Sequence, residues 1–211
     1  MILTGAMTLL AVVLFVPLFI TRGIGPFDFW WWMSANITLL LSLAALLDKG
    51  GLSNISDDMG KDLFSKIGCG LVSALGLYVV FMGGNIVSRA VFPFAGRGIE
   101  DVYAFKTGVS RIRILLLMTL LIGPGEELFW RGFLQRRLMS HNGPFTGYLL
   151  ATAAYALMHV GSGNLMLVLA AGICGLFWGY LYLRTGSIVI NVVSHTVWDI
   201  AIFLLLPVGG L

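Results

Sequence analysis

Charged side chains are scarce in this sequence. Of its 211 residues, 11% are charged and 58% are hydrophobic, and the mean hydropathy is +0.94. A soluble globular domain carries roughly 25% charged residues. Soluble protein classes are therefore excluded, and the composition predicts a polytopic protein that is embedded in a lipid bilayer.

Cysteine is equally scarce, and motifs of nucleophilic hydrolases are missing. Cys69 and Cys174 are the only two cysteines, and both lie in apolar segments, where we expect small buried hydrophobes rather than a disulfide or a metal site. The sequence has no Gly-x-Ser-x-Gly and no Gly-x-Gly-Asp. Ser194 stands directly beside His195, but neighbours on a helix point about 100° apart, so they make a poor nucleophile–base pair.

The first stretch lacks the marks of a cleavable leader. Residues 1–20 have no basic n-region and no small-residue cleavage pattern, so we expect them to form a retained first span. The net charge of +3 comes from basic residues that are scattered between hydrophobic segments. We interpret them as topological anchors and lipid-headgroup contacts, and we predict no nucleic-acid partner.

Hydrophobic runs long enough to cross a bilayer recur along the whole chain. A spanning helix needs about 20 apolar residues. On this measure the sequence predicts an all-α transmembrane helical bundle of about seven spans, with an eighth left open. We place the spans at about residues 2–20, 29–47, 67–92, 111–139, 145–160, 164–183 and 187–206.

The predicted bundle is a single integral-membrane domain of residues 1–211. The polar motifs described below lie in a predicted catalytic core at about residues 111–206, and residues 1–110 supply accessory spans. Between spans, residues 54–58 predict a solvated loop, followed by a short amphipathic interfacial helix that contains Leu63, Phe64 and Ile67. Residues 94–110 form a polar, irregular connection, which we interpret as a candidate gate over a site.

The most informative stretch is Gly123-Pro-Gly-Glu-Glu-Leu-Phe-Trp-Arg131. Ionisable residues inside a membrane are costly and point to function by default. Glu127 and Arg131 are i and i+4 on a helix, which suits an ion pair, whereas Glu126 points about 100° away and stays free. Pro124 either begins a helix here or kinks a helix that runs on from Arg111.

Two further polar pairs follow at the same spacing, namely Tyr155-x-x-x-His159 and His195-x-x-x-Asp199. Each pair occupies one helical stripe, so three stripes can converge on one cavity. Structural alternatives stay open for all of them. Glu127 and Arg131 form a purely structural ion pair in that case, and His195 and Asp199 hold helices together.

A carboxylate and two imidazoles around a wet pocket suit amide hydrolysis. One group takes a proton from water, and others stabilise the oxyanion. The competing use of Glu126, His159 and His195 is a divalent metal such as zinc. The sequence contains no His-Glu-x-x-His, so this alternative depends on residues from separate helices.

These three motifs, in this order, resemble the CPBP intramembrane protease family, the CAAX-processing and bacteriocin-processing group that is also called Abi. The matching residues are Glu126-Glu127-x-x-x-Arg131, Tyr155-x-x-x-His159 and His195-x-x-x-Asp199, within about residues 115–205. The resemblance implies a membrane endopeptidase with its site inside the bilayer. Its members have been described both as metalloproteases and as metal-independent glutamate proteases, so it leaves the cofactor open.

By motif position, the resemblance implies that Glu126 activates water with help from His159. His195 and Asp199 would support the oxyanion or the water, and Glu127 with Arg131 would shape the site. Tyr155 stands where the family usually has phenylalanine, which adds a hydroxyl that can bond into the site. Asp199 replaces the asparagine of the eukaryotic CAAX proteases, which argues against a prenylated substrate.

The sequence thus predicts an intramembrane peptidase that cuts a peptide or a membrane-protein segment, with a prokaryotic inner membrane as its expected location. One rival function is a non-enzymatic immunity or regulatory protein that uses the polar cluster structurally. A proton-coupled carrier is disfavoured, because residues 1–110 lack the matching polar half that an inverted repeat would supply. The oligomeric state stays open.

Overall fold

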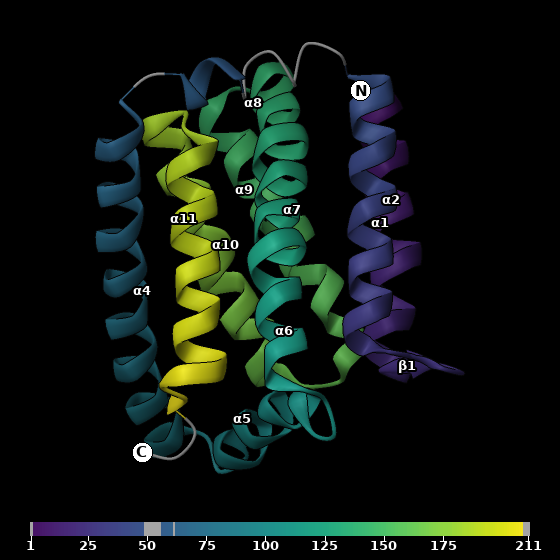
Figure 1. The fold of residues 1–211 in the computed structure, drawn as a ribbon, viewed down its shortest axis with the longest axis vertical. Helices are drawn as coiled ribbons and strands as arrows, with labels where there is room; N and C mark the ends of the chain where they lie inside the picture. Colours follow the sequence, from purple (N-terminus) through teal and green to yellow (C-terminus); the bar gives the residue numbers. More distant parts are fainter. Residues whose placement is uncertain (1, 49–55, 61, 209–211) are drawn as a thin grey trace.

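The computed structural model describes residues 2–48, 56–60 and 62–208. Helices make up nearly all of this part of the chain, and they run side by side as a bundle (Figure 1). The predicted all-α bundle is therefore confirmed. An unpredicted two-stranded hairpin, β1 (Gly23–Ile24) with β2 (Phe27–Asp28), joins the first two long helices.

The first half of the chain supplies three long helices and one short helix. These are α1 (Ile2–Thr21), α2 (Phe29–Leu47), α4 (Leu63–Val91) and α5 (Ala95–Tyr103), the last continued by the 3-10 turn η1 (Ala104–Lys106). In Figure 1, α1 and α2 stand on one side of the bundle, α4 stands on the other side, and α5 lies across one end.

The second half fills the space between these outer helices. A continuous helical run consists of α6 (Arg111–Leu117), η2 (Met118–Ile122), α7 (Gly123–Glu127), η3 (Leu128–Gln135) and α8 (Arg136–Asn142). After it come α9 (Pro144–Met158), η4 (His159–Ser162), α10 (Leu165–Thr185), α11 (Ile188–Asp199) and η5 (Ile200–Leu205). Helix α11 packs against both α4 and α7, and α10 packs against α9.

Five helices in the described residues are long and apolar enough to cross a membrane. They are α1, α2, α4, α10 and the run of α11 with η5, and they correspond to five of the predicted spans. The run from Arg111 and the 15-residue α9 fall outside this set, so the count of seven spans is not confirmed. The five helices fit an integral multi-pass membrane protein.

Local side-chain chemistry sets the ends of several helices. The Asp28 carboxylate accepts the N–H groups of Trp30 and Trp31 and so caps α2. Asn164 caps α10 in the same way. Gly143 lies between α8 and α9 with φ +85°, a left-handed conformation that favours glycine, and the turn expected there is present.

The helix that runs through Pro124 does not begin at that residue. The N–H of Gly123 donates to the carbonyl of Met118, five residues back, so η2 is a π-helical turn. Pro124 has no N–H to donate, and the wider turn before it lets the helix continue without a break. The prediction of a helix start at Pro124 is wrong, and the alternative of a helix running on from Arg111 is right.

Two predicted connections also differ from the structure. Leu63, Phe64 and Ile67 belong to the first turns of α4, because no breaker separates them from the apolar run that follows. Residues 56–58, predicted to lie in a loop, belong to a short helical segment at residues 56–59; residues 54 and 55 lie outside the described residues. Most of the stretch 94–110 is helical rather than irregular, in α5 and η1. The amphipathic helix at the edge of the bundle is therefore α5.

Candidate active site

A single cavity of about 470 Å³ receives polar side chains from all three predicted motifs. Most of its wall is apolar. Its polar members from the motifs are Glu126 of α7, Tyr155 of α9, His159 of η4, and His195 and Asp199 of α11. The predicted convergence of three helical stripes on one cavity is therefore found in the structure.

Glu126 enters this cavity with one oxygen held and one oxygen open. Its side chain comes from α7, and the residue is only 5% exposed. The Tyr155 hydroxyl donates to Glu126 Oε2 at 2.9 Å, and His195 Nε2 lies 3.9 Å from the same oxygen. Glu126 Oε1 makes no hydrogen bond with the described residues, so it is open to a water molecule in the cavity.

Glu127 lies behind the cavity wall, and both of its carboxylate oxygens accept hydrogen bonds from protein donors. Its Oε1 accepts from Arg131 Nη1 at 2.8 Å and from His195 Nδ1 at 2.7 Å. Its Oε2 accepts from the Asn191 amide at 3.0 Å. The residue is 0% exposed and is not among those that line the cavity. Because both oxygens already accept from protein donors and the residue does not line the cavity, Glu127 positions His195 and Arg131 rather than water.

The hydrogen bond of His159 fixes its tautomer. His159 Nδ1 lies 2.9 Å from the carbonyl oxygen of Tyr155, and a carbonyl can only accept, so Nδ1 carries the proton. The other nitrogen, Nε2, is the one left to accept a proton or a water hydrogen. The Phe19 ring packs on the imidazole with centroids 4.7 Å apart, which keeps the ring in place.

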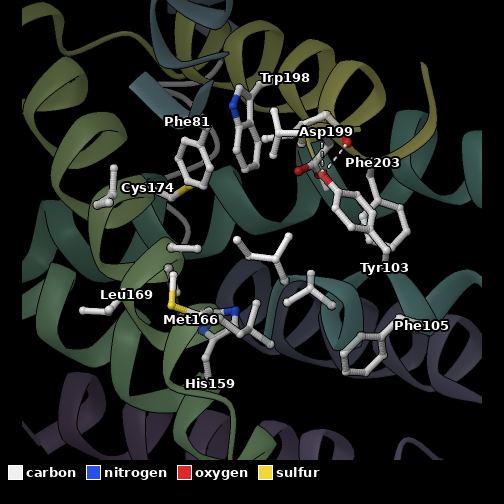
Figure 2. Close-up of a pocket in the computed structure, with 18 of the residues that line it drawn as sticks. Phe81, Tyr103, Phe105, His159, Met166, Leu169, Cys174, Trp198, Asp199 and Phe203 are labelled. Atoms are coloured by element: carbon white, nitrogen blue, oxygen red, sulfur yellow. Dashed lines mark hydrogen bonds between the residues drawn. The ribbon is translucent and has the colours of Figure 1, made fainter. Parts of the chain in front are cut away.

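His195 is held on three sides. Nδ1 donates to Glu127, and the Trp178 indole stacks on the imidazole with ring centroids 3.7 Å apart. The remaining nitrogen, Nε2, lies 3.5 Å from Asp199 Oδ2. In Figure 2, Asp199 and His159 lie at opposite sides of the pocket, so a substrate placed between them meets a polar group on each side.

Arg131 completes the wall behind the site. It is 2% exposed, and its guanidinium lies over the Tyr155 ring at 4.9 Å from the centroid and over the Trp178 ring at 5.7 Å. A cation over aromatic faces is stabilised by the ring quadrupoles. The buried charge is therefore paired both with Glu127 and with two rings that themselves contact the site.

Sequence reasoning missed two residues of this arrangement. Asn191 donates to Glu127, and Trp178 stacks on His195. The spacing contained a signal for Asn191, because it stands four residues before His195 and so shares the stripe of His195 and Asp199. Nothing in the spacing distinguished Trp178 from other apolar residues of α10.

The predicted metal ligands do not assemble into a binding group. Across residues 2–48, 56–60 and 62–208, no group of three or more His, Cys, Asp or Glu side chains is arranged so that it could hold a metal ion. The set of Glu126, His159 and His195 therefore does not fit a zinc ion in this arrangement. The zinc alternative stays a prediction, and no metal step is derived from it.

The expectation that both cysteines are buried holds for one of them. Cys174 is a buried free cysteine that lines the cavity, whereas Cys69 is a free cysteine on the exposed side of α4, so the predicted burial of Cys69 is wrong. Helix α5 contributes Ile99, Val102 and Tyr103 to the wall, so the segment that was expected to cover a site does border this one.

Comparison with known families identifies the part of the chain that carries the site. Residues 108–201 match the family described as Type II CAAX prenyl endopeptidase Rce1-like, and all seven predicted site residues fall within this segment. Comparisons with curated proteins and with solved structures found no match. The family match supports a CAAX-type intramembrane endopeptidase in general. Residues 108–201 are thus similar to the Rce1-like family, which is consistent with the CAAX protease resemblance of the three motifs.

Proposed function

We propose that this protein hydrolyses a peptide bond inside the membrane with water activated by Glu126 and His159. The observation that supports the proposal most directly is that Glu126 lines a cavity together with His159, His195 and Asp199, while its Oε1 makes no hydrogen bond with the described residues. A carboxylate that serves only structure would be expected to have both oxygens paired, as Glu127 has.

The proposed reaction begins with a water molecule between Glu126 and His159. Glu126 takes a proton from this water, and the resulting hydroxide attacks the carbonyl carbon of the scissile bond. His159 Nε2 accepts the second water hydrogen in a hydrogen bond and so orients the attacking oxygen. The proton held by Glu126 then passes to the leaving nitrogen as the carbon–nitrogen bond breaks.

His195 and Asp199 are proposed to face the carbonyl oxygen of the substrate. Negative charge develops on that oxygen in the tetrahedral intermediate. A preorganised hydrogen-bond donor at this position stabilises the charge and so lowers the activation free energy. His195 Nε2 is the candidate donor. Because the Nδ1–H is already bonded to Glu127, Nε2 carries a hydrogen only when the imidazole is protonated, a state that the neighbouring carboxylates of Glu127 and Asp199 favour. Asp199, 3.5 Å away, orients this nitrogen, and Glu127 with Arg131 positions the imidazole from behind.

The proposed substrate is a peptide or a membrane-associated protein segment. The cavity wall combines the polar end with many aromatic and aliphatic side chains from α4, α5 and α10. Such a wall suits an apolar peptide segment that enters from lipid. Because lipid is itself apolar, this segment would be bound by close packing against the wall rather than by the hydrophobic effect. The residue on each side of the cut bond is not assigned.

The decisive experiment compares the purified protein with its Glu126→Gln variant. Both are reconstituted in lipid vesicles and incubated with a mixture of membrane-protein peptides, and new termini are identified by mass spectrometry. Removing the base should lower cleavage at least about 100-fold. Glu100→Gln on the exposed side of α5 is the matched control and should cleave as the parent does.

The result also bears on the non-enzymatic alternative. If Glu126→Gln folds with an unchanged melting temperature and cleaves as well as the parent, the peptidase proposal is overturned. A parent protein that cleaves none of the peptides, while its Glu126 variant keeps a cellular phenotype, would favour the immunity or regulatory function. The three hydrogen bonds that the Glu127 carboxylate accepts are the observation that fits a structural use of these residues.

A further inference from the structure

The segment that follows η5 is joined to η5 by one backbone bond, from the Leu206 N–H to the Ala201 carbonyl at 2.7 Å, and is held against the cavity by side chains of other helices. The carbonyl of Leu206 accepts from the Tyr78 hydroxyl at 2.8 Å, and the carbonyl of Val208 accepts from the Asn85 amide at 3.0 Å. The N–H of Val208 donates to the Tyr103 hydroxyl at 3.0 Å. Tyr78 and Asn85 belong to α4 and Tyr103 to α5, so two helices together hold this segment.

The polar groups of this cradle are oriented by other bonds. Arg89 Nε donates to Asn85 Oδ1 at 2.9 Å, which turns the amide nitrogen toward Val208. The Tyr103 hydroxyl donates to the carbonyl of Ile202 at 3.1 Å, which leaves its oxygen to accept the Val208 N–H. Figure 2 shows Tyr103 beside Phe203 and Asp199, with hydrogen bonds drawn as dashed lines. The Asn85 amide and the Tyr103 hydroxyl are thus already oriented to bind one backbone C=O and one backbone N–H, respectively.

Val208 lies at the boundary of the same cavity as Glu126. It lines the cavity together with Asn85 and Tyr103, and it is 5% exposed. The bonds that hold it involve only its N–H and C=O, which every residue but proline offers. A peptide that enters the cavity can therefore take over the same two bonds without a loss in hydrogen-bond number.

We infer that Asn85 and Tyr103 form a subsite for the backbone of a substrate peptide, and that Val208 occupies this subsite as an internal plug. The plug must leave before a peptide can bind. The inference deepens the proposed function, on which its role in cleavage rests, but occupation and release of the subsite can be measured without any cleavage.

Release of the plug can be followed through Cys174. This thiol lines the cavity and is 4% exposed, so reagents reach it only when the cavity opens. All proteins carry Cys69→Ala, because Cys69 is exposed and would react first. They are treated with N-ethylmaleimide in lipid vesicles, and the modification of Cys174 is timed by mass spectrometry.

The test variant is Val208→Asp, with Leu206→Asp as the matched control. An aspartate at the buried position 208 should drive the segment out and speed the labelling of Cys174 about tenfold, since labelling follows the population of the open state. Leu206 is 58% exposed, so the same charge there should leave the rate within about twofold of the parent. Equal rates in all three folded proteins would overturn the inference.

A peptide with the sequence of residues 205–208, Leu-Leu-Pro-Val, supplies the second measurement. Added to the Val208→Asp protein, it should restore slow labelling, whereas Leu-Leu-Pro-Asp should not. If Val208→Asp fails to fold, the milder Val208→Gly takes its place in the same assays. Labelling that neither peptide slows, in whichever variant folds, counts against the subsite.

A cleavage assay on the same variants distinguishes the proposed plug from the proposed peptidase activity. With the plug weakened, the peptidase of the proposed function should show a higher kcat/KM. Faster labelling with no cleavage in any variant would support the plug and contradict the peptidase. Cleavage that depends on Glu126, together with labelling that Val208→Asp leaves unchanged, would support the peptidase and contradict the plug.

Discussion

At the scale of single residues, the phenol of Tyr155 is the group that decides how Glu126 is presented. Its hydroxyl holds Oε2 at 2.9 Å, whereas Oε1 makes no hydrogen bond with the described residues. Hydrogen bonds to charged groups contribute about 1.5–3 kcal/mol. We therefore expect Tyr155→Phe to lower kcat about tenfold or more, and to leave KM within about twofold, because it acts on the water rather than on substrate binding.

A matched variant tests whether this loss is specific to the site. Tyr148 lies on the same helix, α9, but away from the cavity, and its hydroxyl donates to the carbonyl of Leu176 in α10 at 3.1 Å. Tyr148→Phe removes a hydroxyl of the same kind and should keep the parent kcat. Full activity of Tyr155→Phe, or an equal loss in both variants, would contradict the role assigned to Tyr155.

Sequence spacing predicted part of this site because helix geometry is local. Residues four apart share a stripe, and the Glu127–Arg131 ion pair is indeed present at 2.8 Å. Spacing could not predict that Glu127 also takes bonds from His195 and Asn191, because these come from another helix. These bonds to Glu127, and the absence of such a bond to Glu126 Oε1 among the described residues, depend on how α7 and α11 pack against each other.

At the scale of elements, η4 carries His159 into the cavity and is fixed by its contact with α1. A methyl group at Gly161 would overlap the backbone carbonyl oxygen of Val16. Gly161→Ala should therefore push α1 away from η4. We expect a destabilisation of about 1–3 kcal/mol, seen as a lower melting temperature, and a loss of cleavage because His159 stands two residues before the contact.

The control for this variant is another helical glycine with room around it. A methyl group at Gly172 of α10 would meet nothing within 4 Å. Alanine is favoured over glycine in a helix by up to about 1 kcal/mol, so Gly172→Ala should melt at or above the parent temperature. A melting temperature of Gly161→Ala equal to that of Gly172→Ala would mean that the α1–η4 contact is not tight.

Helix boundaries followed from the sequence wherever breakers are strong. The ranges 2–20 and 29–47 lie within a residue of the helices Ile2–Thr21 and Phe29–Leu47, because the Arg22–Pro26 cluster separates them. The π-helical turn before Pro124 could not be predicted. Hydrogen bonds to the fifth rather than the fourth preceding residue do not change the pattern of apolar residues in the sequence. Helix α5 was missed because its short polar sequence lacks the length of a span.

At the scale of the whole molecule, the chemistry of the site predicts how activity responds to chelators. No described group of three or more His, Cys, Asp or Glu side chains is arranged for a metal, and the proposed steps use only the side chains of Glu126, His159, His195 and Asp199. Dialysis against EDTA, followed by assay with and without added zinc, should change kcat/KM by less than about twofold. Loss of cleavage on dialysis that zinc alone restores would favour the metal alternative.

Stability of the whole bundle should depend on pH through Asp58, which lies outside the spans. Its carboxylate accepts from Lys66 Nζ at 2.7 Å, from the Val189 N–H at 2.9 Å and from the Ser187 hydroxyl at 3.0 Å. These bonds join the short helical segment 56–59 to the start of α4 and of α11. Burial raises the pKa of Asp58, but the bonds outweigh it, so the pKa lies below its usual 3.8.

The sign of the effect follows from that lowered pKa. A carboxyl with a lower pKa in the folded state stabilises it at pH values above the unfolded pKa, and the contribution is lost as the pH falls through the folded pKa. The melting temperature of the parent should therefore drop between about pH 6 and about pH 3 by more than that of Asp58→Asn, which has no such carboxylate to protonate. Asp57→Asn, at an exposed neighbouring position, should keep the full parental drop, because the other acids of the chain titrate equally in all three proteins. An Asp58→Asn protein with the same drop as the parent would show that the junction of α4, α11 and segment 56–59 does not depend on this charge.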